Sequence, residues 1–484
     1  MSEISPFNPI GQDEWAAQEA ARRQEEMAQQ RAIARAARVW RTLDDRLKLL
    51  ALLAVAALAP LLSGNSYLLR VAGITGLYVV LALGLNVVAG YAGLLDLGYV
   101  AFYGVGAYTY ALLASAQFNL HLPFALILLL AILLTTLLGL ALGSLSLRLR
   151  GDYLAIVTLG FGQIASLLFL NLDRPMNITG GPNGIVNLDA IRLLGHTLQS
   201  ARAYYYLILC FVGFVFLVVF HLDRSRIGRA WRALCEDELA AQTMGVDVRR
   251  QKLLAFAVGA AIAGTAGTLF AAWQGAVFPP NFDLSILIIF YAMIVLGGVG
   301  SIWGAVSGAV ILSILPELLR SPDTARLIFY GGLILGLLAL SRRNHQRGLR
   351  LLVGVVLLGI VVKVAVGLLA AGATLQPVLQ ASTARSFIGP FVGILNQWMV
   401  FPRAPHAIGN FAFVVALALL LGAARWPKGR DVLLVPGLYT LAFAWETRLV
   451  QEPSITRMII FGVLLVLMMN YRPQGLLGEK RVQR

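Results

Sequence analysis

Long apolar runs alternate with short basic segments along most of this chain. Runs close to the length of a bilayer-spanning helix recur between about residues 49 and 470, for example at 122–147, 204–220 and 351–371. A transmembrane barrel strand would instead alternate polar and apolar residues over about ten positions. The pattern predicts an all-α fold, a polytopic bundle of membrane-spanning helices.

The basic residues predict how these helices are oriented. Lys and Arg are enriched in cytoplasmic loops, so the basic flank at 31–48 is expected to be cytoplasmic. Counting spans forward from this flank leaves every later basic loop on the same side, with about fourteen spans and both termini in the cytoplasm. The expected spans are 49–63, 67–89, 97–116, 122–147, 152–171, 203–220, 253–273, 285–298, 302–319, 327–340, 351–371, 408–423, 431–447 and 455–470.

One apolar segment, at 386–401, does not fit this count. If it crossed the membrane, the basic loop at 425–430 would lie outside the cell. We therefore expect a re-entrant or interfacial helix, with Trp398 at the level of the lipid headgroups.

The same pattern divides the chain into four parts. Residues 1–48 are expected to form a cytoplasmic helical extension, because they are rich in Ala, Arg, Glu and Gln and lack the features of a signal peptide. A core at 49–341 follows, with a hydrophilic run near 226–252. The other two parts are an additional block of membrane helices at 342–453 and a final span with a cytoplasmic tail at 454–484.

A span and its lead-in occur twice in the second half of the chain. The segments "SPDTARLIFYGGLILGLL", from Ser321, and "EPSITRMIIFGVLLVLMM", from Glu452, align without gaps. The residues shared by the two copies are Pro322 with Pro453, Arg326 with Arg457 and Gly331 with Gly462. The alternative, that two unrelated apolar spans merely look alike, stays open. If the repeat is real, the helices between its copies are an insertion.

Composition narrows the class of protein. The 484 residues have a mean hydropathy of +0.77 and only 13% charged residues, whereas charged residues make up about a quarter of a typical soluble chain. The net charge of +15 does not indicate nucleic-acid binding, because Arg and Lys lie in short loops and not on one basic face. The two cysteines, Cys210 and Cys235, lack the spacing of a disulfide or metal site, so no metal and no cofactor are expected.

Glycines are dense between residues 83 and 110, in "LGLNVVAGYAGLLDLGYVAFYGVGAYTY". Small residues let transmembrane backbones approach closely, and a helix that breaks beside a cavity offers its polar groups to a solute. A carboxylate is costly in lipid, so Asp96 must face a partner, water or a pathway, unless it lies at the membrane interface. Tight helix packing is the alternative reading of the glycines. The candidates for a translocation pathway are Asn86, Gly90, Gly93, Asp96, Gly98 and Gln163.

The segment "ITGGPNG" at 178–184 lies in a long loop predicted outside the cell. Its composition is typical of consecutive tight turns, which by itself requires no function. The length and exposure of the loop make it a candidate landing place for an external partner. The candidate residues are Gly180, Gly181, Pro182, Asn183 and Gly184.

The longest charged run after residue 48 is "RIGRAWRALCEDELAAQTMGVDVRRQKL", at 226–253. Apolar residues at helical spacing, followed by Gly245 and a second basic segment, predict helix, turn and helix on the cytoplasmic side. A solvated loop helix is one interpretation, and a contact that receives force from a separate motor is the other. The chain has no G-x-x-x-x-G-K-[ST] phosphate loop and no convincing catalytic or metal cluster, so we expect no enzyme activity.

Several of these stretches resemble one known family, the permease subunits of ABC importers for branched-chain amino acids, of the LivM type. The matching stretches cover about residues 68–342 and the last thirty residues, and include "RLRGDYLAIVTLGFGQI", "ITGGPNGI", "IVLGGVGS" and "RPQGLL". The resemblance implies a multi-pass protein of the cell inner membrane that works with cytoplasmic ATPase subunits, a sister permease and an extracytoplasmic substrate-binding protein. The chain would be a passive subunit that translocates the amino acid substrate by alternating access when ATP closes its partners.

The resemblance also assigns the charged run. "EDELAAQTMG", at 236–245, matches the coupling helix that docks into the ATPase, but Leu239 stands where the general importer pattern has Glu, and Glu238 lies one place earlier. The residues carried over are Glu236, Asp237, Glu238, Leu239, Ala240, Ala241 and Gly245. Two alternatives remain: a related permease for urea or short-chain amides, and an ion-coupled secondary transporter in which Asp96 would bind a proton or sodium ion.

Overall fold

The structure is a computed structural model of the whole chain. It describes residues 45–62, 66–146, 152–193, 196–320, 322–343, 347–369, 398–399, 405–426, 430–449, 462, 465–466 and 474–477. The expected extension at 1–48 and the expected span at 455–470 lie almost entirely outside these residues.

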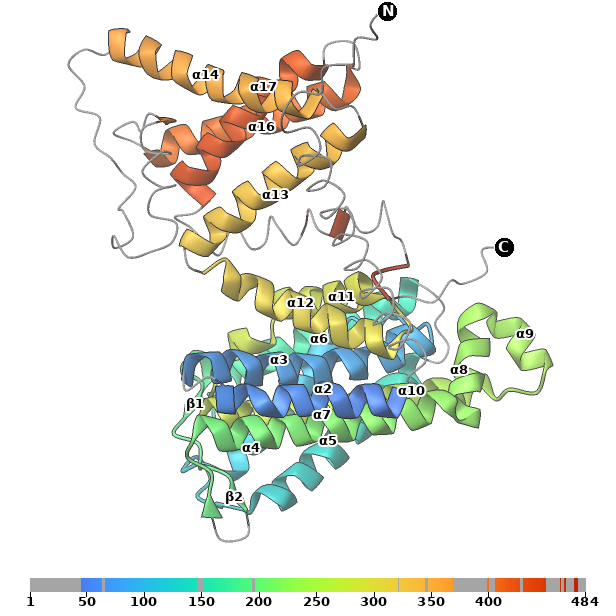
Figure 1. Cartoon of the computed structure of the whole chain (residues 1–484). Helices are drawn as coiled ribbons and strands as arrows, with labels where there is room; N and C mark the ends of the chain where they lie inside the picture. The colour runs from blue at the N-terminus through green and yellow to red at the C-terminus, as the bar shows by residue number, and fades with distance from the viewer. Residues whose placement is uncertain are drawn as a thin grey trace, which may run out of the picture.

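The first part of the chain forms a bundle of long helices that run in roughly the same direction (Figure 1). Its elements are α2 (Asp45–Leu62), α3 (Ser66–Leu85), the π-helical turn η1 (Asn86–Tyr91), α4 (Tyr99–Leu113), α5 (Phe124–Ser146), α6 (Asp152–Asn171), α7 (Ala201–Arg224), α8 (Arg226–Glu236), α9 (Glu238–Thr243), α10 (Val248–Gln274), the 3₁₀ turn η3 (Pro279–Phe282), α11 (Leu284–Gly297) and α12 (Ile302–Leu318). We call these elements the core bundle.

Helix α10 packs against α3, α4 and α5, which places it at the centre of the core bundle. Its small residues allow this contact: a Cβ added at Gly267 would overlap the carbonyl oxygen of Tyr103 on α4, and one at Gly106 would overlap that of Gly264. Close backbone approach at small residues is the usual way in which membrane helices associate. The glycine and alanine content of α10 therefore determines which helices can surround it.

Short irregular elements close one end of the core bundle. The 3₁₀ turn η2 (Gly181–Asn183) leads into β1 (Ile185–Val186), which pairs antiparallel with β4 (Ala276–Val277) just after α10. A second pair joins β2 (Arg192–Leu193) to β3 (His196–Thr197). In Figure 1 these strands lie at the opposite end of the bundle from α8 and α9.

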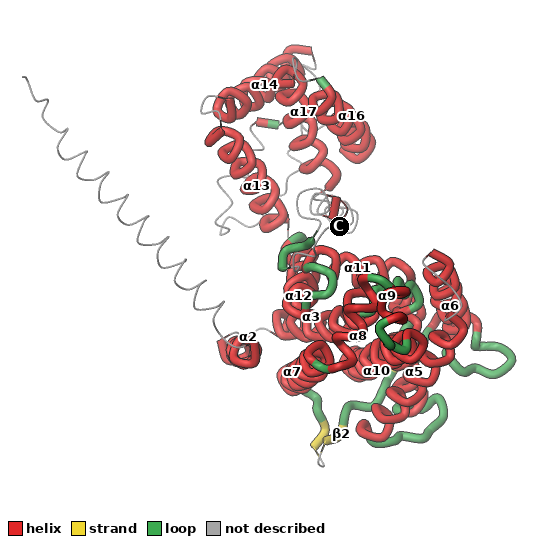
Figure 2. The backbone as a smooth tube through the Cα atoms, turned by 90° about the vertical axis from the view of Figure 1, so that its right-hand side faces the viewer, coloured by secondary structure: helices red, strands yellow, loops and turns green. Residues whose placement is uncertain are grey.

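The helices after α12 pack mainly against one another. They are α13 (Pro322–Arg343), α14 (Arg347–Leu369), α16 (Pro405–Arg425), α17 (Arg430–Ala444) and the π-helical turn η5 (Trp445–Leu449). Figures 1 and 2 show them on one side of the core bundle. We call this group the accessory helices.

A buried ion pair joins the two ends of the accessory helices. The Arg326 Nε of α13 lies 3.0 Å from a carboxylate oxygen of Glu446 in η5, and Tyr330 donates to the other oxygen at 3.2 Å. Phe329 stacks on Trp445 with ring centroids 4.2 Å apart. These contacts hold α13 against η5.

The membrane prediction is confirmed at the level of fold class. Seven of the described helices are long and apolar enough to cross a membrane, and shorter apolar helices lie at Leu47–Leu58, Ile302–Leu318, Thr324–Leu337 and Ile408–Ala423. The expected span at 97–116 is the shorter helix α4, which begins at Tyr99 after a break in the chain. The number of about fourteen spans and the side of each terminus stay predictions.

Trp398 packs against two of the accessory helices, and its level at the lipid headgroups stays a prediction. Its indole Nε1 donates to the carbonyl of Val356 at 3.1 Å, and its ring packs edge-on against Tyr439 of α17. Val356 is near the middle of α14, so Trp398 lies beside the middle of that helix and not at the level of its end. Apart from Met399, the rest of 386–401 is outside the described residues.

Candidate functional site

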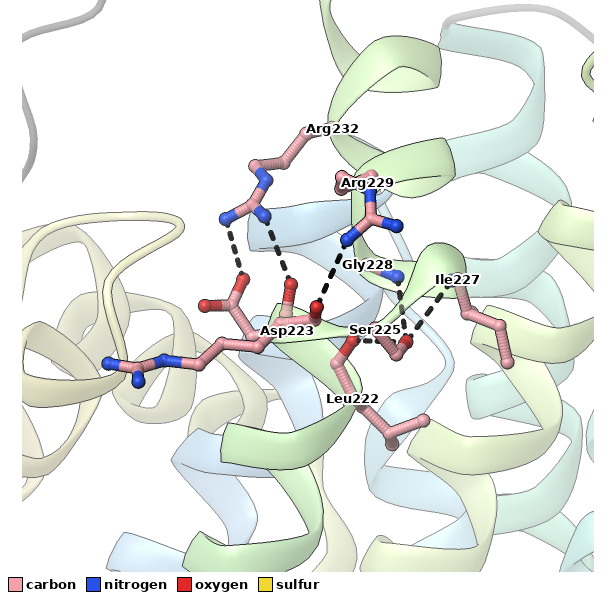
Figure 3. A network of polar contacts seen from close by, with 8 residues as sticks. Leu222, Asp223, Ser225, Ile227, Gly228, Arg229 and Arg232 are labelled. Atoms are coloured by element: carbon pink, nitrogen blue, oxygen red, sulfur yellow. Dashed lines mark hydrogen bonds and ion pairs between the residues drawn. The ribbon is translucent and has the colours of Figure 1, made fainter. Parts of the chain in front are cut away.

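The chain turns sharply between α7 and α8, and polar contacts fix the turn (Figure 3). Ser225 caps α8, because its hydroxyl oxygen accepts from the backbone N–H groups of Ile227 at 3.1 Å and Gly228 at 3.3 Å. A Cβ at Gly228 would overlap the carbonyl oxygens of Leu222 and Asp223. Glycine at this position therefore lets α8 fold back closely on the end of α7.

Two arginines of α8 return to the end of α7 (Figure 3). Arg232 contacts the Asp223 carboxylate at 2.9 Å and its carbonyl at 3.0 Å, and Arg229 donates to the carbonyl of Arg224 at 3.2 Å. The last carbonyls of a helix lack partners within the helix and attract cations. An ion pair this exposed stabilises by less than about 1 kcal/mol, so these contacts chiefly set the angle between α7 and α8.

Helix α9 is short and is terminated at both ends by its own sequence. The Asp237 carboxylate accepts from the N–H groups of Leu239 and Ala240 at 2.9 and 3.0 Å, which is an N-cap. At the other end, Gly245 has φ +82° and donates to Gln242, while the next residue donates to Ala241, the pair of bonds that defines a Schellman motif. The single turn and a half of α9 therefore has a defined position after α8.

The seven residues predicted for the coupling helix lie together in this element, which projects from the end of the core bundle (Figures 1 and 2). Leu239 is 63% exposed, whereas Ala241 is only 4% exposed and faces inward. Glu236, Asp237, Ala240 and Gly245 are exposed, and Glu238 is half-buried. We call residues 226–243 the α8–α9 unit.

The α8–α9 unit also contacts a break in the helices beneath it. Trp231 is fully buried and donates to the carbonyl of Gln251 in α10 at 3.0 Å. Cys235 lies against Gly93, where an added Cβ would be 2.8 Å from the thiol sulfur. Gly93 belongs to the non-helical segment 92–98 between η1 and α4, so α8 touches the place where the chain is unwound.

Asp96 is fully buried within this break. One carboxylate oxygen accepts from Gly98 N–H at 2.9 Å, and its backbone carbonyl accepts from the Tyr291 hydroxyl at 2.8 Å. The neighbouring N–H of Leu97 donates to the hydroxyl of Thr158 at 2.9 Å. The second carboxylate oxygen of Asp96 has no hydrogen-bond partner among the described residues. The break is therefore tied to α6 and α11 and contains an unsatisfied acceptor.

Asn86 begins the π-helical turn just before the break and is also fully buried. Its side-chain oxygen accepts from the N–H of Gly300 at 2.9 Å, while its amide nitrogen has no partner within the described part of the chain. A Cβ at Gly90 would overlap the Asn86 oxygen, and one at Gly98 would lie 2.6 Å from the Thr158 carbonyl. The glycines of this region therefore serve close packing as well as the break itself.

The structure brings some of the predicted pathway residues together. Gly93, Asp96 and Gly98 share the break, whereas Gln163 is exposed on α6. Thr158, Tyr291 and Gly300 were not predicted, because each comes from a distant segment and carries no motif. Only their hydrogen bonds to the break identify them.

The loop at 178–184 lies at the opposite end of the core bundle. Gly180, Gly181 and Gly184 all have positive φ, which confirms a series of tight turns, and Pro182 and Asn183 between them are exposed. A Cβ at Gly184 would overlap the Val277 carbonyl in β4, next to the end of α10. The exposed tip of the loop is thus held by the strand that follows the central helix.

A short C-terminal stretch, 474–477, returns to the end of the core bundle that carries α8. The N–H groups of Leu476 and Leu477 donate to the carbonyls of Leu296 and Gly297 at 2.9 and 2.8 Å. These carbonyls belong to the last turn of α11, where partners within the helix run out. The stretch therefore completes the end of α11.

These features define a class of protein: a multi-pass, all-α membrane protein with a broken helix in its core and a hydrophilic helical unit at one end. The chain belongs to the family described as "Branched-chain amino acid transport system / permease component", whose model matches residues 67–338. The matched region runs from α3 into α13 and includes both the break and the α8–α9 unit. The chain is thus a transport permease and not an enzyme.

Individual relatives agree with this membership. The chain is 41% identical over 316 residues to the high-affinity branched-chain amino acid transport system permease protein LivM of Escherichia coli (strain K12), covering 60% of this chain and 73% of that protein. It is 27% identical over 275 residues to a probable LivM of Methanocaldococcus jannaschii, covering 50% of this chain and 79% of the relative. A shorter match, 39% over 107 residues, is to LivH of Escherichia coli and covers 22% and 34% of the two chains. No solved structure matches the chain.

Proposed function

We propose that this chain is the membrane-spanning subunit of an ATP-driven ABC importer for branched-chain amino acids in the cell inner membrane. The observation that carries the proposal is the α8–α9 unit, a capped hydrophilic element that projects from the end of a bundle matched by a permease family. In this arrangement both termini and the α8–α9 unit are cytoplasmic, and the chain crosses the membrane about fourteen times.

The motor of this importer is a separate cytoplasmic ATPase. The sequence has no phosphate-binding loop of its own, so energy must enter through a protein contact. The α8–α9 unit is suited to receive it, because caps fix its shape and Trp231 and Cys235 connect it to α10 and to the break at 92–98. Residues 236–241 and Gly245 form the proposed coupling helix.

The break at 92–98 is the proposed moving part beside the translocation pathway. Asn86, Gly90, Gly93, Asp96 and Gly98 lie in or next to it, with two buried polar atoms that have no partner in the described chain. A broken helix offers such groups to a polar solute when the surrounding helices separate. Gln163 stays a weaker candidate for the same pathway, because its side chain is exposed on α6.

External partners complete the importer. An extracytoplasmic binding protein would deliver the amino acid at the loop of 178–184, at the end opposite the α8–α9 unit, and a sister permease would form the other half of the pathway. The short match to LivH fits such a sister relationship between two permeases of one family.

The accessory helices are proposed to be an addition to the permease. The sequence division places the added block at 342–453 between a core at 49–341 and a final span at 454–484, and leaves 1–48 as a cytoplasmic extension. The contacts of α13 with α14 and of Arg326 with Glu446 join the added helices to α13, which the family match covers to residue 338.

Uptake into vesicles tests the proposal. The chain, its sister permease, the ATPases and the binding protein should take up leucine only with internal ATP, and vanadate should stop uptake while ionophores that collapse ion gradients should not. The purified chain alone should hydrolyse no ATP. Uptake that depends on an ion gradient would instead support the secondary transporter, and uptake of urea but not leucine would support the amide permease.

A further inference from the structure

The two sides of α9 differ sharply in chemistry. Leu239 and Met244 are 63% and 84% exposed, and Ala240, Gln242 and Thr243 between them are exposed and uncharged. The opposite side carries the buried Ala241 and the half-buried Glu238. Exposed apolar side chains indicate a contact surface where several lie together, as Leu239 and Met244 do at the two ends of this short helix.

Glu238 faces α10, where it pairs with Lys252. The Lys252 ammonium lies 2.8 Å from a Glu238 carboxylate oxygen, and the Lys252 side chain is only 8% exposed. A buried ammonium requires an opposite charge or a set of acceptors, because leaving water is costly for an ion. Among the described residues, Glu238 is the group that meets this requirement for Lys252.

The same end of α10 holds α8 as well. Trp231 donates to the carbonyl of Gln251, the residue that precedes Lys252. Two neighbouring positions of α10 are therefore attached to α8 and to α9 respectively. A force on the tip of α9 reaches α10 directly through the ion pair and also through α8.

We infer that α9 docks on the ATPase through its uncharged tip, Leu239, Ala240 and Met244, and that Glu238 and Lys252 are positioning residues that hold this tip in place. The matching partner surface is apolar, because the tip itself carries no charge. The inference rests on the proposed function and assigns to Glu238 an inward role, not a contact with the partner.

A double-substitution cycle tests the positioning role in the assembled transporter. Glu238→Gln leaves a buried ammonium without its counter-charge, and Lys252→Met leaves the carboxylate without its partner. Each should lower leucine uptake and ATPase co-purification by about tenfold or more, whereas the double variant, which buries no unpaired charge, should recover to within about threefold of wild type. Arg202→Met makes a similar change at an exposed site near the other end of α7 and should behave as wild type.

A direct contact between Glu238 and the ATPase would give a different pattern of defects. If Glu238 contacts the ATPase directly, Lys252→Met will be harmless and the double variant will be as defective as Glu238→Gln. Membrane insertion and gel-filtration profiles of each variant in detergent show whether the chain is folded. A folded Lys252→Met chain with normal uptake overturns the positioning role.

Charge at the tip tests the docking surface. Leu239→Asp and Met244→Asp should abolish co-purification of the ATPases, and the size-conserving changes Leu239→Met and Met244→Leu should preserve it. Normal assembly of both Asp variants overturns the inferred surface while the wild-type complex still supports the proposed function. A wild-type chain that never binds the ATPases overturns the proposed function itself.

Discussion

Gly93 and Gly245 share a backbone conformation but differ in what surrounds them. Both have positive φ, +68° and +82°, which L side chains adopt only at a cost of roughly 1–2 kcal/mol. At Gly245 an added Cβ meets nothing within 4 Å, whereas at Gly93 it lies 2.8 Å from the Cys235 sulfur. At Gly245, therefore, only the backbone conformation requires glycine. At Gly93, both the backbone conformation and the contact with α8 require it.

At Gly245, the size and charge of a substituent should matter more than its backbone preference. Gly245→Asn should keep uptake within about twofold of wild type, because Asn tolerates the left-handed region. Gly245→Arg should lower uptake by about tenfold or more while the chain inserts normally, because a bulky charge at the end of α9 obstructs the ATPase groove. The checks are uptake and ATPase co-purification, and normal transport by the Arg variant would show that the α8–α9 unit is not the coupling element.

A substitution at Gly93 should impair uptake, and a second substitution at Cys235 should partly restore it. Gly93→Ala should reduce uptake because the new Cβ and the Cys235 sulfur cannot both keep their positions. Adding Cys235→Ala removes that sulfur and should restore part of the loss, leaving only the backbone strain. Gly160→Ala, in a helix with nothing within 4 Å of the added Cβ, is the matched control. Full loss in the double variant would mean that α8 and the break are not in mechanical contact.

The sequence indicated which residues at 86–98 are atypical of a membrane span, but not which side chains and backbone groups they bond to. Density of glycine and the presence of a carboxylate in an apolar run indicated 86–98. The partners of this segment, Thr158, Tyr291 and Gly300, are far away along the chain, and their residue types are common in any span. Long-range pairing of this kind depends on helix packing, which a pattern of apolar positions does not encode.

The sequence predicted where helices lie along the chain better than it predicted which helices pack together. Apolar length predicted most helices of both groups, because that property belongs to each segment alone. It did not predict that α13 packs with α14 and η5, where Arg326 is 4% and Glu446 1% exposed. Those two charges come from helices that the sequence had placed in different parts, and only their meeting shows that they belong to one unit.

Removing one partner of the Arg326–Glu446 ion pair should therefore destabilise the chain more than removing both. Arg326→Met leaves the Glu446 carboxylate buried without a cation, a change that typically costs about 3–5 kcal/mol. We expect a clear fall in the midpoint of thermal aggregation of the detergent-solubilised chain. The double variant Arg326→Met with Glu446→Gln should recover most of the loss, and an equal loss in single and double variants would contradict a structural role for the pair.

On the scale of the whole molecule, the accessory helices are proposed to be an insertion that separates two parts of one permease. The core bundle ends with α12, and the stretch 474–477, after the second copy of the repeated span, returns to cap α11. The family match to 67–338 includes the first copy, but the capping stretch follows the second. This arrangement is what an insertion between two copies of a terminal span would produce.

Removing the insertion tests this view. Joining Arg326 directly to Met458 deletes an even number of expected passages and keeps Arg326 in the register of Arg457. The shortened chain should insert with unchanged topology, bind the ATPases and transport leucine. Reduced expression is compatible with the idea. Labelling of a C-terminal cysteine from outside, or a chain that assembles but never transports, would mean that the accessory helices belong to the pathway.

The cap on α11 also has a consequence for biosynthesis. The carbonyls of Leu296 and Gly297 are translated well before Leu476 and Leu477, the residues that donate to them. All of the accessory helices emerge from the ribosome in between. The end of α11, the helix that supplies Tyr291 to the break, can therefore receive its last two backbone partners only after every accessory helix has been synthesised.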